Sequence, residues 1–288
     1  MPGRPFIQDD AALPERYSTD DARMRRNVLR ETILRFENCP TGDRYLGQAK
    51  LNLARWKSAA HSPSSSPEIL VLPGDWGEVT QGLTKRFGQC FAMLNMANAY
   101  VPGGAYVEGA IAQEENMYRR TDCHFYILPP HYDVERDRYS PEATQLLSGE
   151  HGYVYLDSSN PRVCIRGPED RESADLGYPW LESNEIFPFF ELKAAAQDLR
   201  RGASFNADQA RRQIRAQIKT LSRAMIRHVV FGAFGCGAFK NPAEEVAKLY
   251  KEELTANRIH FDVVAFAIFD AGYGPDNYRP FKTVLGTT

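Results

Sequence analysis

The stretch that decides the fold is residues 95–105, Asn-Met-Ala-Asn-Ala-Tyr-Val-Pro-Gly-Gly-Ala. It leaves the apolar run 90–96, which is short enough to be a fully buried parallel strand. Open α/β sheets bind ligands at the carboxyl ends of their strands, so we predict a binding loop here. Paired glycines let backbone N–H groups approach a ligand closely, and the Asn98 amide is suited to sugar hydroxyls. A Pro-Gly-Gly turn without a ligand is the alternative at this point.

Outward from this loop, strand patterns alternate with helical patterns. We expect strands at 68–72, 90–96, 162–165, 229–231 and 263–269, and helices at 22–36, 79–87, 113–120, 206–227 and 242–254. This alternation predicts an α/β fold with three layers, a mixed but mostly parallel sheet carrying helices on both faces. We expect a flexible N-terminal arm over 1–20. One domain then covers 21–288, with a loop-rich insertion at about 129–190 that is a candidate for specificity.

Composition excludes several classes of protein. The chain has 288 residues, a formal net charge of -2 and 43% hydrophobic residues, so nothing drives it globally toward nucleic acid. No apolar run reaches the roughly 20 residues of a membrane span, and the first ten residues lack the apolar core of a secretory signal. Five cysteines without a C-x-x-C pair favour a reducing compartment. We expect a cytoplasmic protein, or one delivered to a host cytosol if it is a bacterial effector.

Eight residues beyond the Gly-rich loop, Gln113, Glu114 and Glu115 open a predicted helix. Acidic residues are common in a first helical turn because they complement the helix dipole. A carboxyl group beside a bound sugar, however, becomes a general acid if burial raises its pKa. Adjacent helical residues point about 100° apart, so these two carboxylates cannot straddle one glycosidic bond. We therefore expect one to transfer protons and the other to orient a hydroxyl.

A second Gly-rich turn, residues 231–242, lies between a predicted strand and a predicted helix. Its N–H groups and the helix N-terminus would form an anion site suited to a diphosphate, with Phe239 against a ribose or base. Two further strand ends are less specific. Asp75 is suited to accept from an adenine amino group or to cap the next helix, and Phe269 is suited to stack on adenine or to pack in a turn.

The sequence gives little indication of a metal site or of a dinucleotide-binding site. The six histidines form no visible metal-ligand cluster, and we expect no metal and no cofactor. Gly235 and Gly237 resemble part of a nicotinamide-dinucleotide fingerprint, but the third glycine is missing. A nicotinamide-dependent oxidoreductase remains the weakest alternative.

Taken together, residues 95–115 and 231–242 resemble the poly(ADP-ribose) glycohydrolase branch of the macrodomain family, in its smaller bacterial type. That family carries a Gly-Gly-Gly loop, then Gln-Glu-Glu at fixed spacing, then a distant Gly-Cys-Gly-x-Phe turn. The resemblance extends over roughly 22–285 and is poor in the loop-rich middle. One departure concerns the third loop glycine, which is Ala105 here.

By motif position, the resemblance implies that Glu115 is the catalytic acid and that Glu114 holds the ribose. The implied ligand contacts are Asn98, Gly103, Gly104, Ala105, Gln113, Gly235, Cys236, Gly237, Ala238 and Phe239. The expected activity is hydrolysis of the glycosidic link from ADP-ribose to poly(ADP-ribose) or to an ADP-ribosylated protein. The alternative is a macrodomain that binds ADP-ribose without cleaving it, a possibility to which Ala105 points. The oligomeric state is left open.

Overall fold

A computed structural model of the chain describes residues 3–5, 13–39, 44–60, 67–127, 131–256, 260–270, 272 and 274–286. Within these residues, six strands form one sheet in the order β1-β8-β7-β2-β6-β5. They are β1 (Glu68–Pro73), β2 (Ala92–Met96), β5 (Tyr155–Cys164), β6 (Phe187–Ala194), β7 (His228–Phe231) and β8 (Val263–Ile268). All neighbours pair in parallel except β5, which runs antiparallel to β6 at one edge. The predicted α/β class with a mostly parallel sheet is confirmed.

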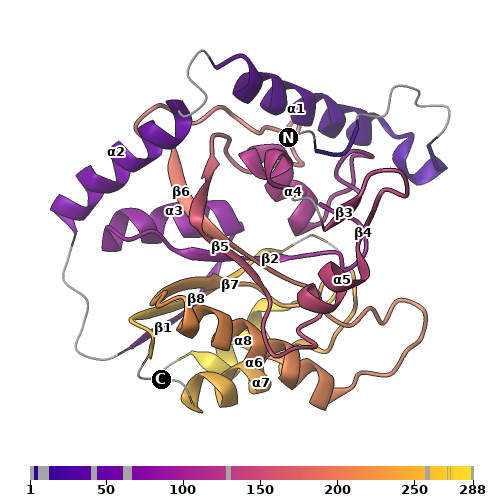
Figure 1. Cartoon of the computed structure of the whole chain (residues 1–288), viewed down its shortest axis with the longest axis vertical. Coiled ribbons are helices and arrows are strands. Elements are labelled where there is room, and N and C mark those ends of the chain that lie inside the picture. Colours follow the sequence, from indigo (N-terminus) through magenta and orange to yellow (C-terminus); the bar gives the residue numbers. More distant parts are fainter. Residues whose placement is uncertain are drawn as a thin grey trace.

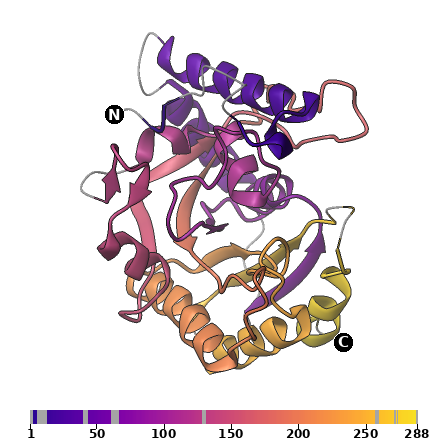
Figure 2. The same cartoon turned by 90° about the vertical axis from the view of Figure 1, so that its right-hand side faces the viewer.

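Helices cover both faces of this sheet, as Figures 1 and 2 show. One layer contains α6 (Ala207–Arg223), α7 (Ala243–Ala256) and α8 (Tyr278–Leu285), and the other contains α1 (Asp20–Glu37), α2 (Arg44–Ala59), α3 (Trp76–Phe87) and α4 (Gln113–Arg120). Each layer has its own apolar core against the sheet, because strands buried on both faces present side chains to both layers. Thr32 of α1 donates to the Arg119 carbonyl at 2.7 Å, which fixes α4 beneath α1.

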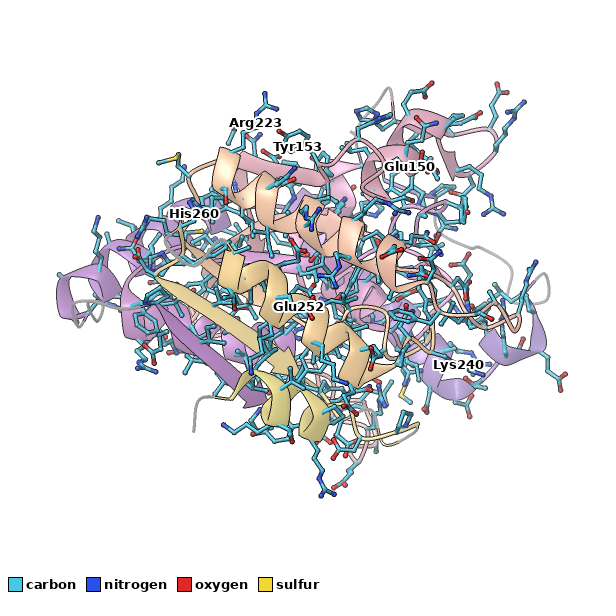
Figure 3. All side chains as sticks on the ribbon, turned by 90° about the horizontal axis from the view of Figure 1, so that it is seen from below. Glu150, Tyr153, Arg223, Lys240, Glu252 and His260 are labelled. Carbon is cyan, nitrogen blue, oxygen red and sulfur yellow. The ribbon has the colours of Figure 1, made fainter. Side chains whose placement is uncertain are left out.

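The outer face of the α6–α8 layer carries a basic stripe at four-residue steps along α6, formed by Arg211, Arg215, Lys219 and Arg223. Arg211 donates to Glu252 of α7 at 2.5 Å, and the Arg223 guanidinium lies 5.2 Å from the Tyr153 ring centroid. Figure 3 shows Arg223 beside Tyr153 at one end of this layer and Glu252 on the neighbouring helix. The stripe is therefore used in surface ion pairs between helices.

Two expectations about chain organisation need correction. The predicted insertion 129–190 contains a small hairpin, β3 (Tyr132–Asp133) with β4 (Arg138–Tyr139), the helix α5 (Pro141–Leu147) and all of β5. The start of β6 also lies in it, and β6 is the inner strand that pairs with β2. The sequence pattern does not predict this strand. Pro188 and the charged residues Glu191 and Lys193 break the apolar run that a buried strand normally shows.

The second correction concerns the N-terminal arm. Arg4 is buried, and its guanidinium contacts Asp137 at 2.5 Å and Glu108 at 3.0 Å. Residues 15–17 form a short 3-10 helix whose Tyr17 carbonyl accepts from Arg26 of α1 at 2.9 Å. The arm is therefore held by ion pairs and hydrogen bonds where it is described. The Ser- and Pro-containing residues 61–66 lie outside the described residues.

None of the described helices is both long enough and apolar enough to cross a bilayer.

Candidate active site

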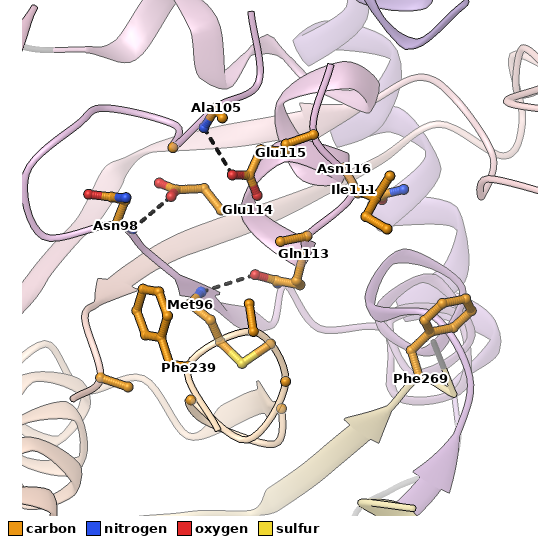
Figure 4. Close-up of a pocket in the computed structure, with 18 of the residues that line it drawn as sticks. Met96, Asn98, Ala105, Ile111, Gln113, Glu114, Glu115, Asn116, Phe239 and Phe269 are labelled. Atoms are coloured by element: carbon orange, nitrogen blue, oxygen red, sulfur yellow. Dashed lines mark hydrogen bonds between the residues drawn. The ribbon is translucent and has the colours of Figure 1, made fainter. Parts of the chain in front are cut away.

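The carboxyl ends of β1, β8, β7 and β2 meet at one edge of the sheet, because these four strands run in parallel. A cavity of about 1000 Å³ opens there. Its volume lies at the upper end of the usual range for small-molecule sites. The strand order places the Asp75 and Phe269 loops at one end, the Gly-rich turn after β7 in the middle, and Asn98 with the acidic pair at the β2 end. Figure 4 shows Phe269 far across the cavity from Glu114 and Glu115.

The Gly-rich loop after β2 holds Glu115 directly. The Ala105 N–H donates to Glu115 Oε1 at 2.9 Å (Figure 4). Gly104 has a φ of +58°, and a Cβ at this position would collide with the Glu115 carboxylate. Only glycine therefore fits between the loop and the acidic pair. Gly103, predicted to contact the ligand, instead packs against the rings of Tyr106 and Tyr118, and its contribution is to the shape of the loop.

Glu114 lies on the same side of Gly104 as Glu115 and is also buried. Its side chain is 3% exposed, and Glu115 is 8% exposed. The Asn98 N–H donates to Glu114 Oε2 at 2.7 Å, whereas Oε1 is buried without a hydrogen-bond partner among the described residues. Buried polar atoms are normally paired, so an unpaired oxygen on a residue that lines the cavity indicates a place where a ligand hydroxyl can donate.

Burial raises the pKa of both carboxyl groups, and the charge of Glu115 raises the pKa of Glu114 further. The Asn98 N–H and the Lys193 ammonium lower the pKa of Glu114, while the Ala105 N–H lowers that of Glu115. Two close carboxyls in a desolvated site titrate as a pair, with one proton shared between them over an intermediate pH range. The pair can thus supply one acid and one carboxylate together.

The remaining residues of the two predicted motifs divide into ligand-facing and structural groups. Gln113 uses both ends of its amide on the backbone of β2, accepting from Met96 at 3.0 Å and donating to Leu94 at 3.0 Å. It fixes the start of α4 at the cavity, a role the resemblance did not imply. The side-chain oxygen of Asn98 accepts from the N–H groups of Tyr100 and Val101. The amide nitrogen of Asn98 is therefore the group that can donate to a ligand.

The second Gly-rich turn, after β7, is closed by its own backbone and by one buried side chain. Asn241 donates to the Gln197 carbonyl at 2.7 Å and to the Gly235 carbonyl at 3.0 Å. No hydrogen bond to another described residue uses the N–H of Gly237 or Ala238, and both residues line the cavity. These N–H groups are suited to an anion. The Cys236 thiol is buried and burial raises its pKa, so at this turn only its backbone is suited to a ligand.

At the far end of the cavity lie Asp75 and Phe269, the two residues predicted to lie near adenine. Asp75 Oδ1 accepts from the N–H groups of Gly77 and Glu78 and pairs with Arg120 at 2.6 Å. The capping role is therefore confirmed for Asp75, although the residue also lines the cavity. Phe269 is half-exposed, with the Arg171 guanidinium 5.6 Å from its ring centroid. The ring is thus available for stacking.

Sequence reasoning missed several cavity residues that come from distant segments. The Arg200 guanidinium lies 4.9 Å from the Phe239 ring centroid, and Arg4 donates to the Gly104 carbonyl at 2.6 Å. Further cavity residues come from the N-terminal segment and from the predicted insertion: Arg16, Tyr17, Arg136, Asp137, Glu169 and Arg171. No local motif marks these positions. Over the described residues, no three His, Cys, Asp or Glu side chains form a group able to hold a metal ion.

Comparison with known families gives one match. Residues 24–147 match the family described as microbial-type PARG, catalytic domain, a segment that includes the Gly-rich loop and the acidic pair. No curated protein sequence matches the chain.

Solved structures with a similar fold include enzymes from Thermomonospora curvata and Deinococcus radiodurans. Poly(ADP-ribose) glycohydrolase from Thermomonospora curvata has a TM-score of 0.62 and 21% identity, and covers 91% of this chain and 99% of its own. Its complex with the inhibitor ADP-HPD has a TM-score of 0.61 and 20% identity, with the same coverage of 91% and 99%. The enzyme from Deinococcus radiodurans in complex with ADP-ribose has a TM-score of 0.54 and 20% identity, and covers 85% of this chain and 92% of its own. At these identities the likeness establishes the fold.

Proposed function

We propose that this chain, whose residues 24–147 match the microbial-type PARG catalytic domain, is an ADP-ribosyl glycohydrolase. It hydrolyses the glycosidic link from ADP-ribose to poly(ADP-ribose) or to an ADP-ribosylated protein. One observation carries the proposal. The Ala105 N–H holds Glu115 at 2.9 Å in a buried acidic pair, at the end of a cavity whose other end presents Phe269.

The order of groups along the cavity fits the parts of ADP-ribose. Adenine lies by Phe269 and Arg171, the diphosphate lies at the N–H groups of Gly237 and Ala238, and the distal ribose lies at the acidic pair. A ribose hydroxyl donates to Glu114 Oε1, which supplies the partner that this buried oxygen lacks within the described residues. The ligand thereby follows the strand order β8, β7, β2.

Glu115 acts as both acid and base in the proposed reaction. Its carboxyl proton passes to the departing oxygen while the glycosidic bond breaks and the ribose becomes oxocarbenium-like. Water then adds to the anomeric carbon, and the Glu115 carboxylate takes a proton from that water. Glu114 holds the ribose hydroxyl throughout. The site residues supply all the proton transfers that this hydrolysis needs.

The test is the variant Glu115→Gln, which retains an acceptor for the Ala105 N–H but carries no acidic proton. We expect release of ADP-ribose to fall at least about a hundredfold, as for loss of a general acid, while calorimetry still detects ADP-ribose binding. The matched control is Glu150→Gln, which changes an exposed carboxylate outside the cavity. Substrates are automodified poly(ADP-ribosyl)ated protein and proteins singly modified on Ser, Arg, Thr or Glu.

Two results would contradict the proposal. Turnover by Glu115→Gln at the wild-type rate would exclude Glu115 as the acid. Binding of ADP-ribose without release from any of these substrates would instead identify a macrodomain that only binds ADP-ribose. Polymer and singly modified proteins are tested side by side, so the same assay identifies the leaving group.

A further inference from the structure

One peptide group of the Gly-rich loop after β2 is held on both of its sides. The Ala105 N–H donates to Glu115 Oε1 at 2.9 Å (Figure 4). The Gly104 carbonyl, which belongs to the same peptide group, accepts from Arg4 Nη1 at 2.6 Å. The N–H and C=O of a planar trans peptide point in opposite directions, so a donor that fixes the carbonyl also fixes the N–H. Arg4 therefore lies across one peptide group from the proposed catalytic acid.

Arg4 is itself held firmly in place. Its backbone N–H donates to the Tyr106 hydroxyl at 3.2 Å, and its guanidinium pairs with Asp137 at 2.5 Å. The main chain before it lies close against His124, since a Cβ at Gly3 would collide with that residue. The Arg4 side chain is buried. Arg4 can therefore act as a fixed donor to the loop.

The peptide between Gly104 and Ala105 has a second, unproductive orientation. Gly104 has no Cβ, so its own conformation does not prevent the peptide from reversing. Reversal would turn the carbonyl oxygen toward the Glu115 carboxylate and take the N–H away. It would also carry φ of Ala105 from negative to positive values, which the alanine methyl group disfavours. Two features thus oppose reversal: the hydrogen bond from Arg4 and the methyl group of Ala105.

We propose that Arg4 is a positioning residue for catalysis, which holds the Gly104–Ala105 peptide so that its N–H faces Glu115. This inference rests on the proposed function, because the direction of the N–H affects the rate only if Glu115 is the acid. A charged donor on the carbonyl also polarises the peptide and strengthens its N–H as a donor. Arg4 thus acts on Glu115 through a single peptide group.

Other charged groups act on Glu115 from three places in the fold. They are Glu114 and Arg119 of α4, Glu108 of the loop between β2 and α4, and Arg200 of the segment between β6 and α6. None of them is substituted in the experiment. A change in the behaviour of Glu115 therefore reports on the N-terminal segment and the peptide that it holds.

The kinetic experiment compares ADP-ribose release by the wild type and by Arg4→Met on the substrate that the wild type cleaves. We expect kcat to fall about tenfold and KM to stay within a few-fold, because the acid is misplaced while the ligand site is kept. The Ala105 N–H lowers the pKa of Glu115, and a general acid must be protonated. The alkaline limb of kcat/KM should therefore move to higher pH in Arg4→Met, by about half a unit.

Tyr132→Phe is the matched control. The Tyr132 hydroxyl donates to Asp137 at 2.8 Å, so its removal loosens the anchor of Arg4 without touching the Gly104 carbonyl. Tyr132 does not line the cavity. We expect wild-type kcat and a wild-type alkaline limb in this variant.

A double variant tests whether the two restraints act on the same peptide. Arg4→Met and Ala105→Gly are measured alone and together. Each single variant leaves one restraint in place, whereas the double variant leaves none. Its loss of kcat should therefore exceed the product of the two single losses.

The Ala105 amide proton provides a readout that does not depend on turnover. NMR spectra of protein with isotope-labelled alanine identify this proton by its absence from Ala105→Gly. In the wild type its shift should follow pH as Glu115 titrates, and Glu115→Gln should abolish that response. In Arg4→Met the amplitude of the response should fall to less than about half, because the N–H no longer faces the carboxyl group. If the wild type hydrolyses nothing, the proposed function fails and this amplitude still judges Arg4.

Three outcomes would overturn the inference. Equal losses in Arg4→Met and Tyr132→Phe would make Arg4 only an anchor of the N-terminal segment. A displaced limb with a full Ala105 response would mean that the Arg4 charge acts through space and not through the peptide. Single losses that simply multiply in the double variant would show that the two restraints are unrelated.

Arg4→Lys decides if Arg4→Met does not fold. Its ammonium group keeps a positive charge between Glu108 and Asp137 but lacks the fork that reaches the Gly104 carbonyl as well. A lower kcat with a reduced Ala105 response supports the proposal. Wild-type values of both overturn it.

Discussion

Gly104 and Ala105 are adjacent, but only position 104 has a backbone conformation that favours glycine. Gly104 has a φ of +58°, while Ala105 is not among the residues of positive φ, so the loop accommodates a methyl group at position 105. Ala105 contributes its N–H to Glu115, an interaction that any residue except proline can provide. The departure at the third glycine is therefore compatible with a complete catalytic loop.

At the residue scale, this difference predicts that substitution of Gly104 impairs the enzyme strongly and that substitution of Ala105 does not. In Gly104→Ala the new methyl group displaces the Glu115 carboxylate, and we expect kcat/KM for ADP-ribose release to fall about a hundredfold. Ala105→Gly keeps the N–H and should remain within a few-fold of wild type. A Gly104→Ala enzyme of wild-type activity would show that the loop does not position Glu115.

At the element scale, the N-terminal segment and the β3–β4 hairpin are joined through one side chain. Arg4 links Asp137 of the hairpin, at 2.5 Å, with the Gly104 carbonyl of the Gly-rich loop after β2, at 2.6 Å. Burial would raise the pKa of Asp137, but hydrogen bonds from Arg4 and Tyr132 outweigh it and lower the pKa. These interactions join three segments that are far apart in sequence.

The prediction at this scale is that Arg4→Met destabilises the fold by about 2 kcal/mol, because it removes the hydrogen bonds from the buried guanidinium to Asp137, Glu108 and the Gly104 carbonyl, while the two carboxylates remain partly exposed. Urea unfolding at pH 7 measures the change. Its control is Arg23→Met, which removes an exposed pair with Asp20 and should cost at most about 1 kcal/mol. As the pH falls below the ordinary pKa of aspartate, Asp137 becomes protonated and the difference between wild type and Arg4→Met should shrink. Equal stability of the two variants would mean that the segment is not anchored by Arg4.

At the scale of the whole molecule, buried acidic groups shape the dependence of stability on pH. Asp122 is buried, and burial raises its pKa to about 7, although the Arg162 charge and the Val163 N–H lower that pKa. A carboxyl whose pKa is raised on folding favours the folded state when protonated. Its contribution is full below the ordinary pKa of aspartate and is lost as the pH rises to about 7.

Asp122→Asn should therefore change how the unfolding free energy depends on pH. Asparagine still accepts from the Val163 N–H, which reaches Asp122 at 2.8 Å, but carries no charge to bury. Relative to wild type, the variant should gain stability progressively between pH 4 and pH 7 and show a constant difference above that range. Thermal unfolding across this range tests it, and a difference independent of pH would show that Asp122 does not titrate in the folded protein.

The sequence by itself determined the class of fold, the Gly-rich loop, the acidic pair and the Gly-rich turn near Gly235. These features are local: glycine spacing, strand periodicity and the start of α4 depend on residues close together in the chain. Only the tertiary structure decided that β6 is an inner strand, that Arg4 reaches the Gly-rich loop after β2, and that Lys193 reaches the Tyr118 hydroxyl of α4. Those features join residues 75 to 100 positions apart, and a charged residue in isolation predicts exposure, since only its distant partners make its burial possible.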